Sequence, residues 1–226
     1  PDSVIDGQTV NASRMEIGRR LSKVSPVEAD LVMPVPESGT PAAIGYAEAS
    51  GIPFKQGMMK NAYVGRTFIQ PSDTLRQLGL RLKLNPVREV IEGKKLVVVD
   101  DSIVRGNTQR KLIRMLREAG AAEVHVRIAS PPVKWPCFYG IDFASPGELI
   151  ANHGRTDNDE AVAESIRTMI GADSLAFVPI DDMIAASNQP KENLCAACFT
   201  GDYPLGLPEG NPNADLVRRI QKGAEA

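Results

Sequence analysis

The chain has 226 residues, of which 42% are hydrophobic and 24% are charged, as is ordinary for a soluble globular protein. Its formal net charge of −2 argues against binding to nucleic acid, which requires clustered lysine and arginine. Because no run of about 18 apolar residues occurs, we expect no membrane span and a cytoplasmic protein. The chain begins at Pro1 rather than methionine, so we expect it to be part of a longer polypeptide.

The first part of the chain shows helix and strand patterns in alternation. Residues 10–24 carry apolar side chains at helical spacing, and we expect a helix there that ends before Pro26. Residues 40–50 are rich in small side chains and are expected to form a second helix. Two short apolar runs predict strands over residues 29–35 and 52–59.

The alternation continues in the second part. Residues 94–100 form a continuous apolar run, which is the pattern of a strand buried on both faces. We expect a helix over residues 109–119, ended by Gly120, and a strand over 123–129. In chain order there follow a helix over 157–170, a strand over 174–178, a helix over 179–186, a surface segment over 188–213 and a closing helix over 214–223. The order predicts an α/β fold in which helices cover a parallel sheet.

The most informative segment is VVVDDSIVRGNT, residues 97–108. The expected strand ends in Asp100 and Asp101, just where ligands bind in open parallel sheets. Residues 102–108 present successive backbone N–H groups beside a helix N-terminus, which suits a phosphate, and Gly106 permits a close backbone approach. The two carboxylates suit sugar hydroxyls or Mg²⁺. A plain strand-to-helix connection is the alternative, but the coincidence of these features favours a phosphate site.

This segment resembles the signature of type I phosphoribosyltransferases that binds phosphoribosyl pyrophosphate (PRPP). Four other blocks resemble the family of glutamine PRPP amidotransferases: the pyrophosphate loop (PVPESG, residues 34–39), the two ends of the active-site loop (KNAYVGRTFI, 60–69, and RLKLN, 81–85) and the cysteine motif (CAACFTG, 195–201). The resemblance implies a type I phosphoribosyltransferase fold with a flexible lid loop. We expect a phosphoribosyltransferase domain over residues 1–187 and an irregular C-terminal extension over 188–226.

The resemblance also implies roles for single residues. Asp100 and Asp101 bind the ribose hydroxyls and, with Ser38, hold Mg²⁺. The 5′-phosphate is bound by Ser102, Ile103, Val104, Arg105, Gly106, Asn107 and Thr108. The pyrophosphate is bound by Glu37, Ser38 and Gly39, in a loop that often carries a cis peptide in the family. PRPP is covered by Lys60, Tyr63, Arg66 and Lys83, and the catalytic set is Asp100, Asp101, Lys83 and Arg66.

Two residues of the phosphate turn depart from the family pattern. The family commonly has Thr at the position of Asn107 and Ser at that of Gln109. Because the turn acts mainly through backbone donors, we expect little loss from either change.

The implied reaction transfers ammonia to C1 of PRPP and yields 5-phosphoribosylamine and pyrophosphate, the first committed step of de novo purine synthesis. Departure of pyrophosphate requires cationic side chains, Mg²⁺ and exclusion of water. A Lys/Arg-rich loop over residues 60–83 can supply the cations and exclude water. Taken alone, that segment is more typical of a solvated charged loop, but beside the PRPP signature we favour the functional interpretation. We expect the N-terminal glutaminase domain to be missing, purine nucleotides to act as feedback inhibitors, and the protein to be a homo-oligomer.

The three cysteines, Cys137, Cys195 and Cys198, are a poor disulfide framework, and the C-x-x-C pair better fits a metal, cluster or redox site. One branch of the family holds a [4Fe–4S] cluster with four cysteines. These three match its pattern, and the fourth is expected upstream of this chain. A zinc site or plain buried thiols are the alternatives.

Two rival functions remain open. A PRPP-sensing regulatory module would keep the phosphate turn without chemistry, but a repressor of this kind should add a DNA-reading element and a basic patch. A base-salvage transferase would need a hood shaped for a nucleobase, and the cysteine motif argues against it.

Overall fold

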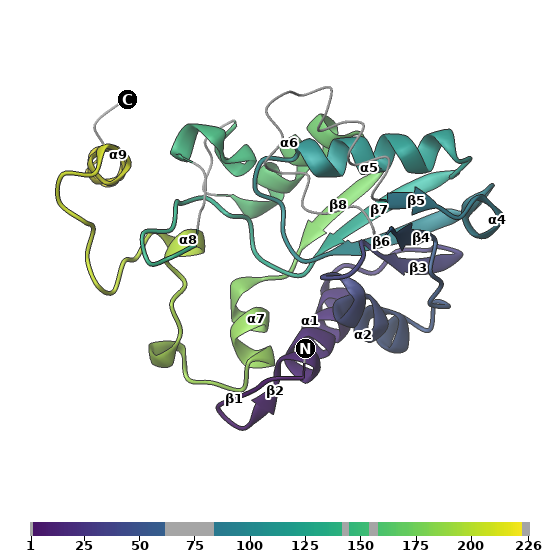
Figure 1. Ribbon diagram of the computed structural model, residues 1–226, viewed down its shortest axis with the longest axis horizontal. Coiled ribbons are helices and arrows are strands. Elements are labelled where there is room, and N and C mark those ends of the chain that lie inside the picture. The colour runs from purple at the N-terminus through teal and green to yellow at the C-terminus, as the bar shows by residue number, and fades with distance from the viewer. Residues whose placement is uncertain (1, 62–83, 142–144, 154–157, 223–226) are drawn as a thin grey trace.

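A four-stranded parallel sheet forms the centre of the computed structural model, which describes residues 2–61, 84–141, 145–153 and 158–222 (Figure 1). Its strands, in spatial order, are β3 (Leu31–Pro34), β6 (Lys95–Asp100), β7 (Glu123–Ile128) and β8 (Ser174–Phe177). All neighbouring pairs are parallel, so every strand ends at the same edge of the sheet. The predicted parallel sheet is confirmed.

Helices cover both faces of this sheet (Figure 1). One face packs against α5 (Asn107–Glu118) and α6 (Asp159–Ile170), and the other against α1 (Val10–Val24), α2 (Thr40–Ser50) and α7 (Ile180–Ala186). The middle of β6 shows why its sequence is apolar throughout: Leu96 and Val98 belong to the first core, and Val97 and Val99 to the second. A strand covered on both faces needs apolar side chains at every position.

Local sequence signals explain where the helices begin and end. The side chain of Thr9 accepts a hydrogen bond from the Ala12 amide at 3.1 Å and caps α1, which occupies the predicted residues. α2 also occupies its predicted residues and ends at Gly51 in the left-handed region. α5 begins at Asn107, two residues before the predicted start, so the phosphate turn leads directly into a helix.

One predicted strand is wrong. Residues 52–57 contribute only an isolated bridge between Phe54 and Val32, and β4 (Met58–Lys60) instead pairs with β5 (Leu84–Pro86) in a separate antiparallel ladder. Pro53 has no amide to donate, so the pairing with Val32 is limited to the Pro53 carbonyl and the Lys55 amide. A short helix, α4 (Arg88–Ile91), follows β5 in a region that lacked strand signals.

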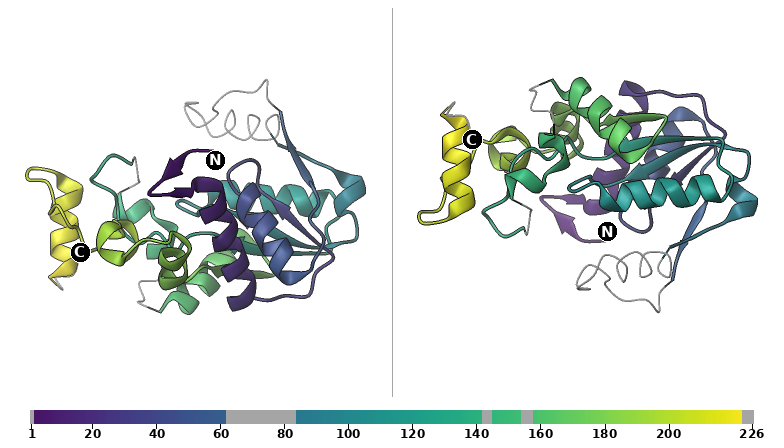
Figure 2. Two further views of the ribbon diagram at one scale, coloured as in Figure 1. Left: turned by 90° about the horizontal axis from the view of Figure 1, so that it is seen from below. Right: turned by 90° about the horizontal axis from the view of Figure 1, so that it is seen from above.

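The remaining elements are short and lie at the ends of the chain and beyond β7. They are β1 (Val4–Ile5), β2 (Gln8–Thr9), η2 (Pro146–Glu148), η3 (Ile150–Asn152), η4 (Lys191–Asn193), α8 (Ala197–Thr200) and α9 (Pro212–Gln221). α9 lies at one end of the molecule, away from the sheet (Figure 2). Among the described residues, no helix has both the length and the apolar character needed to cross a membrane.

Candidate active site

The two predicted binding loops meet at the carboxyl edge of the sheet. The pyrophosphate loop follows β3, and the phosphate turn follows its neighbour β6. The Val35 amide donates to the Val99 carbonyl at 2.8 Å, which extends the pairing of the two strands into the first loop. The peptide bond between Pro36 and Glu37 is cis, as the resemblance led us to expect. Strand adjacency therefore places two segments 60 residues apart in sequence at one site.

Gly39 makes the contact between the two loops close. A Cβ atom at this position would lie 2.4 Å from the Val99 carbonyl oxygen and 3.1 Å from the Asp100 Cα. Real Cβ atoms do not approach a backbone oxygen to that distance, so any side chain here would push the loops apart. Gly39 also precedes α2, and the Ala43 amide donates to its carbonyl at 2.9 Å. The glycine thus fixes the pyrophosphate loop against the end of β6, while Glu37 and Ser38 remain exposed.

The two predicted carboxylates occupy different environments. Asp100 is 7% exposed, whereas Asp101 is exposed and accepts a hydrogen bond from the Ser102 hydroxyl at 3.0 Å. Burial, and secondarily the charge of Asp101, raise the pKa of Asp100 well above its usual value, against the opposing effect of its hydrogen bonds. Asp101 is therefore open to a ligand, and Asp100 is held in the wall of the site.

The phosphate turn is anchored by its apolar side chains. Ile103 is buried in the core beside α5, and Val104 packs against Val133 and Leu149. The Ile150 amide donates to the Val104 carbonyl at 2.9 Å. These contacts fix the backbone of the turn against the core. A site that binds phosphate through backbone N–H groups requires such a fixed backbone.

Gly106 ends the turn and caps α5 without a side-chain hydrogen bond. Its φ of +73° lies in the left-handed region, which favours glycine. The first backbone N–H groups of a helix have no partner within it, and those of Asn107 and Thr108 lie at the N-terminal end of α5, where the helix dipole favours an anion.

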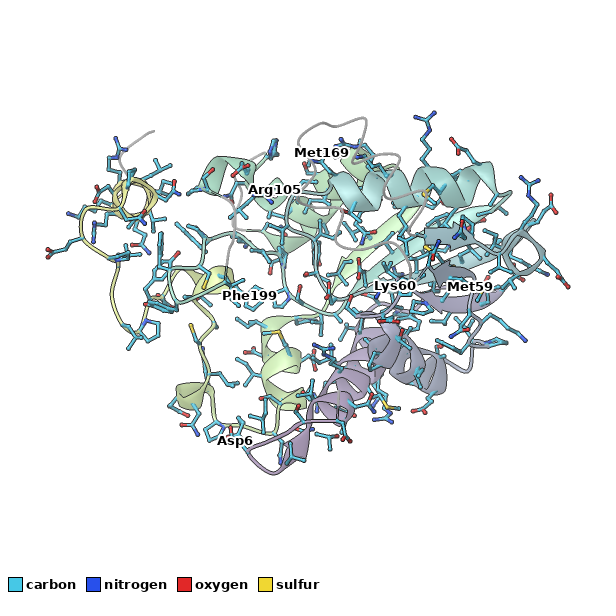
Figure 3. All side chains as sticks on the ribbon, in the orientation of Figure 1. Asp6, Met59, Lys60, Arg105, Met169 and Phe199 are labelled. Atoms are coloured by element: carbon cyan, nitrogen blue, oxygen red, sulfur yellow. The ribbon has the colours of Figure 1, made fainter. Side chains whose placement is uncertain are left out.

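Arg105 lies in the turn that precedes α5, at the surface of the molecule (Figure 3). Its Nε atom lies 3.5 Å from Oε1 of Glu148, and both side chains are about half exposed. Glu148 also accepts from the backbone and hydroxyl of Ser145 at the start of η2. The sequence did not point to Glu148, because nothing in its local pattern indicates a partner 43 residues away.

Lys60 is the only predicted lid residue within the part of the chain that the structure describes, since Tyr63, Arg66 and Lys83 lie outside it. Its Nζ atom donates to Oε2 of Glu37 at 3.1 Å. In the β4–β5 ladder Lys60 pairs with Leu84, so the residues that flank the predicted lid lie side by side. The structure thereby brings Lys60, a residue of the predicted lid, into contact with Glu37 of the predicted pyrophosphate loop.

The three cysteines lie near α8, and Cys198 packs against Val133 and Leu149, the same pair that Val104 of the phosphate turn contacts. The amides of Lys134 and Trp135 donate to the Cys198 carbonyl at 3.1 and 3.0 Å, which ties the Cys137 segment to the C-x-x-C motif. Burial, and to a lesser extent Cys137, raise the pKa of the Cys198 thiol to about 11. Among the described residues, no group of three or more His, Cys, Asp or Glu side chains is arranged to hold a metal. Three thiols do not complete a cuboidal cluster, which generally takes four.

One residue that contacts the site was missed. Gln109 was treated as a neutral departure, yet its Nε2 atom donates to Oδ2 of Asp100. A signal was present in the sequence, because Gln109 shares one helical face with the apolar residues Leu112, Ile113 and Leu116. A polar residue on an apolar stripe indicates a buried partner.

Comparisons with known proteins agree with this geometry. Residues 15–130 match the phosphoribosyl transferase domain family, and the chain therefore belongs to that family. It is 68% identical over 208 residues to the amidophosphoribosyltransferase of Mycobacterium tuberculosis and 53% identical over 219 residues to that of Synechocystis. A solved structure, glutamine PRPP amidotransferase from B. subtilis complexed with ADP and GMP, matches with a TM-score of 0.78 and 52% identity. The predicted resemblance and fold class are confirmed.

The alignments cover most of this chain but less than half of each relative. They span 92% and 97% of this chain against 39% and 42% of the two relatives. The structural match covers 90% of this chain and 44% of the other. The chain thus spans about two fifths of the length of these relatives.

Proposed function

We propose that this chain carries the phosphoribosyl-transfer half of an amidophosphoribosyltransferase, in which ammonia attacks C1 of PRPP. The C1–N bond forms as the C1–O bond to pyrophosphate breaks, pyrophosphate leaves with the electron pair, and the amine loses a proton to give 5-phosphoribosylamine. The observation that carries the proposal is the junction at Gly39, where the pyrophosphate loop lies against the end of β6 and the phosphate turn. The 5′-phosphate and the pyrophosphate of one PRPP molecule would then bind at the ends of adjacent strands.

We assign each part of PRPP to different residues according to their exposure and charge. The turn over residues 102–108 binds the 5′-phosphate through backbone N–H groups and the N-terminus of α5. Asp101, which is exposed, and Asp100 accept from the ribose hydroxyls. Glu37, Ser38 and Gly39 line the pyrophosphate, and Lys60 stabilises the negative charge that develops there. We assign Tyr63, Arg66 and Lys83 to the same lid as Lys60, from the sequence alone.

Mg²⁺ fits this donor set. Among the described residues no ready cage of three acidic or metal-binding side chains exists, but Mg²⁺ is usually held by one or two carboxylates together with waters and substrate phosphates. Asp101, Asp100 and the Ser38 hydroxyl would supply the protein ligands. When bound, the ion neutralises charge on the pyrophosphate oxygens.

Pyrophosphate release from PRPP, with Mg²⁺ and ammonium, tests the function directly. We expect release that depends on both PRPP and ammonium, and no acceleration by nucleobases. Glutamine should not replace ammonium, because we assign its hydrolysis to a separate glutaminase domain. Arg114→Met on the exposed side of α5 is a matched control that should retain full activity. A folded chain that binds PRPP but releases no pyrophosphate would contradict the enzyme and favour a sensing module, and turnover that requires a nucleobase would favour salvage.

The cysteines are proposed to supply three of four ligands to a [4Fe–4S] cluster in the intact protein, with the extension over residues 188–226 as their support. We expect the chain alone to take up little or no cluster, and the full-length protein to show a visible thiolate-to-iron absorption band. Cys195→Ser in the full-length protein should remove this band, whereas a colourless full-length protein reconstituted with iron and sulfide would contradict the cluster.

The intact protein is further proposed to be a cytoplasmic homo-oligomer that purine nucleotides inhibit. The similar B. subtilis enzyme has a solved structure in complex with ADP and GMP, which supports the nucleotide part of this proposal.

A further inference from the structure

Gln109 stands out on the buried side of α5. The other buried residues of this helix are Leu112, Ile113, Met115 and Leu116, all of them apolar. Gln109 itself is only 3% exposed. Burying an amide in such surroundings is unfavourable unless its polar atoms are hydrogen-bonded.

The hydrogen bonds of Gln109 are one-sided. Its Nε2 atom donates to Oδ2 of Asp100, and the Asp101 amide donates to Oδ1 of the same carboxylate at 2.8 Å. The other end of the amide, Oε1 of Gln109, is buried and has no hydrogen-bond partner among the residues that the structure describes. Each oxygen of Asp100 therefore accepts one N–H bond from the protein, and a carboxylate oxygen has a second lone pair to offer.

Packing does not explain a glutamine at this position. Methionine has a similar shape and would fill the space without leaving a buried acceptor unpaired, which costs about 1–3 kcal/mol. What the glutamine provides and methionine cannot is a donor to Asp100. Two donors on opposite oxygens fix the rotation of the carboxylate about its Cβ–Cγ bond, and they do so inside the wall of the binding site.

We propose that Gln109 is a positioning residue for PRPP binding: it holds the Asp100 carboxylate in the orientation that receives the ribose hydroxyls. Because Asp100 meets a ligand only if the chain binds PRPP, this role rests on the proposed function. Gln109 acts through Asp100 and need not touch the substrate. A correctly oriented acceptor serves the bound substrate and the transition state alike, so the loss of Gln109 weakens substrate binding rather than turnover.

Gln109→Met removes the donor while preserving shape. We expect the KM for PRPP and the Kd for Mg²⁺–PRPP, measured by titration calorimetry, to rise about 10-fold, with kcat within about twofold of wild type. Arg114→Met, the same replacement on the exposed side of the same helix, should change neither constant. Gln109→Ala, which cannot clash, repeats the test should the methionine variant fold poorly.

A double-mutant cycle with Asp100→Ala, which leaves no polar side-chain atom for Gln109 to contact, separates positioning from a general structural effect. If Gln109 acts through Asp100, adding Gln109→Met to Asp100→Ala should raise the Kd by less than about twofold. A full additional 10-fold loss would overturn the proposal, as would wild-type affinity in Gln109→Met or a fall in kcat at unchanged KM. Failure of the wild-type chain itself to bind Mg²⁺–PRPP would instead overturn the proposed function, and this role with it.

Discussion

Asp100→Asn should lower kcat/KM for PRPP by at least about 100-fold and leave the fold no less stable. Activity falls because the introduced amide offers one acceptor oxygen where the carboxylate offers two, and carries no charge toward Mg²⁺. The fold survives because the change removes a charge from a side chain that is only 7% exposed. The Gln109 amide can rotate so that Oε1, which finds no partner in the described part of the wild-type chain, accepts from the introduced amide.

The stability effect should depend on pH. Burial and the charge of Asp101 raise the pKa of Asp100, so the folded state binds its proton more tightly than the unfolded state does. The stabilisation that results is fully present below the ordinary aspartate pKa of about 4 and is lost as the pH rises through the raised value. The asparagine variant lacks this dependence, so any stability advantage over the wild-type chain should be largest at alkaline pH and shrink on acidification.

Urea unfolding at several pH values measures the free energy of unfolding of Asp100→Asn and of the wild-type chain. Pyrophosphate release measures their activity. Asp101→Asn is the informative companion, because it should also lose activity but removes only the smaller cause of the raised Asp100 pKa and leaves the burial of Asp100 in place. Its gain in stability at alkaline pH should therefore be smaller than that of Asp100→Asn. A marked destabilisation of Asp100→Asn at alkaline pH would contradict this prediction, because it would show that the buried carboxylate stabilises the folded state.

Gly45→Ala should destabilise the fold by about 3 kcal/mol or more. α1 and α2 pack so closely that a Cβ atom at Gly45 would lie 1.9 Å from the Met15 carbonyl oxygen, and one at Gly18 would lie 1.9 Å from that of Ala42. The atoms in the way are backbone, which no rotamer change can move. The two helices would have to separate, and the apolar contacts between them would be lost.

Chemical denaturation of Gly45→Ala and Gly18→Ala, compared with a glycine-to-alanine control elsewhere in the chain, measures this loss of stability. Gly147→Ala is the control, because no atom of the described residues lies within 4 Å of the added Cβ. We expect its unfolding free energy to stay within about 0.5 kcal/mol of wild type. Since α2 begins directly after Gly39, a shifted α2 should also weaken PRPP binding. Wild-type stability of Gly45→Ala would mean that the helices lie farther apart in solution.

Much of the candidate site was predictable because its parts are contiguous in sequence. The strand, the paired aspartates and the glycine turn over residues 97–108 each carry a local signal, and their order is preserved in the structure. The contacts between segments were not predictable in this way. The ion pairs of Glu37 with Lys60 and of Glu148 with Arg105 join residues whose local patterns indicate only solvated charge.

The sequence by itself determined the elements and their order: an apolar run between turn residues forms a buried strand, and helical periodicity with a cap forms a helix wherever the chain folds. Only the tertiary structure decided which segments meet. It paired residues 58–60 with 84–86 instead of adding them to the sheet, and it placed Gly45 at a helix crossing. It also turned Gln109 toward Asp100, nine residues earlier. The physical reason is that hydrogen bonds and close packing between distant segments depend on distances in space. A local sequence pattern does not determine those distances.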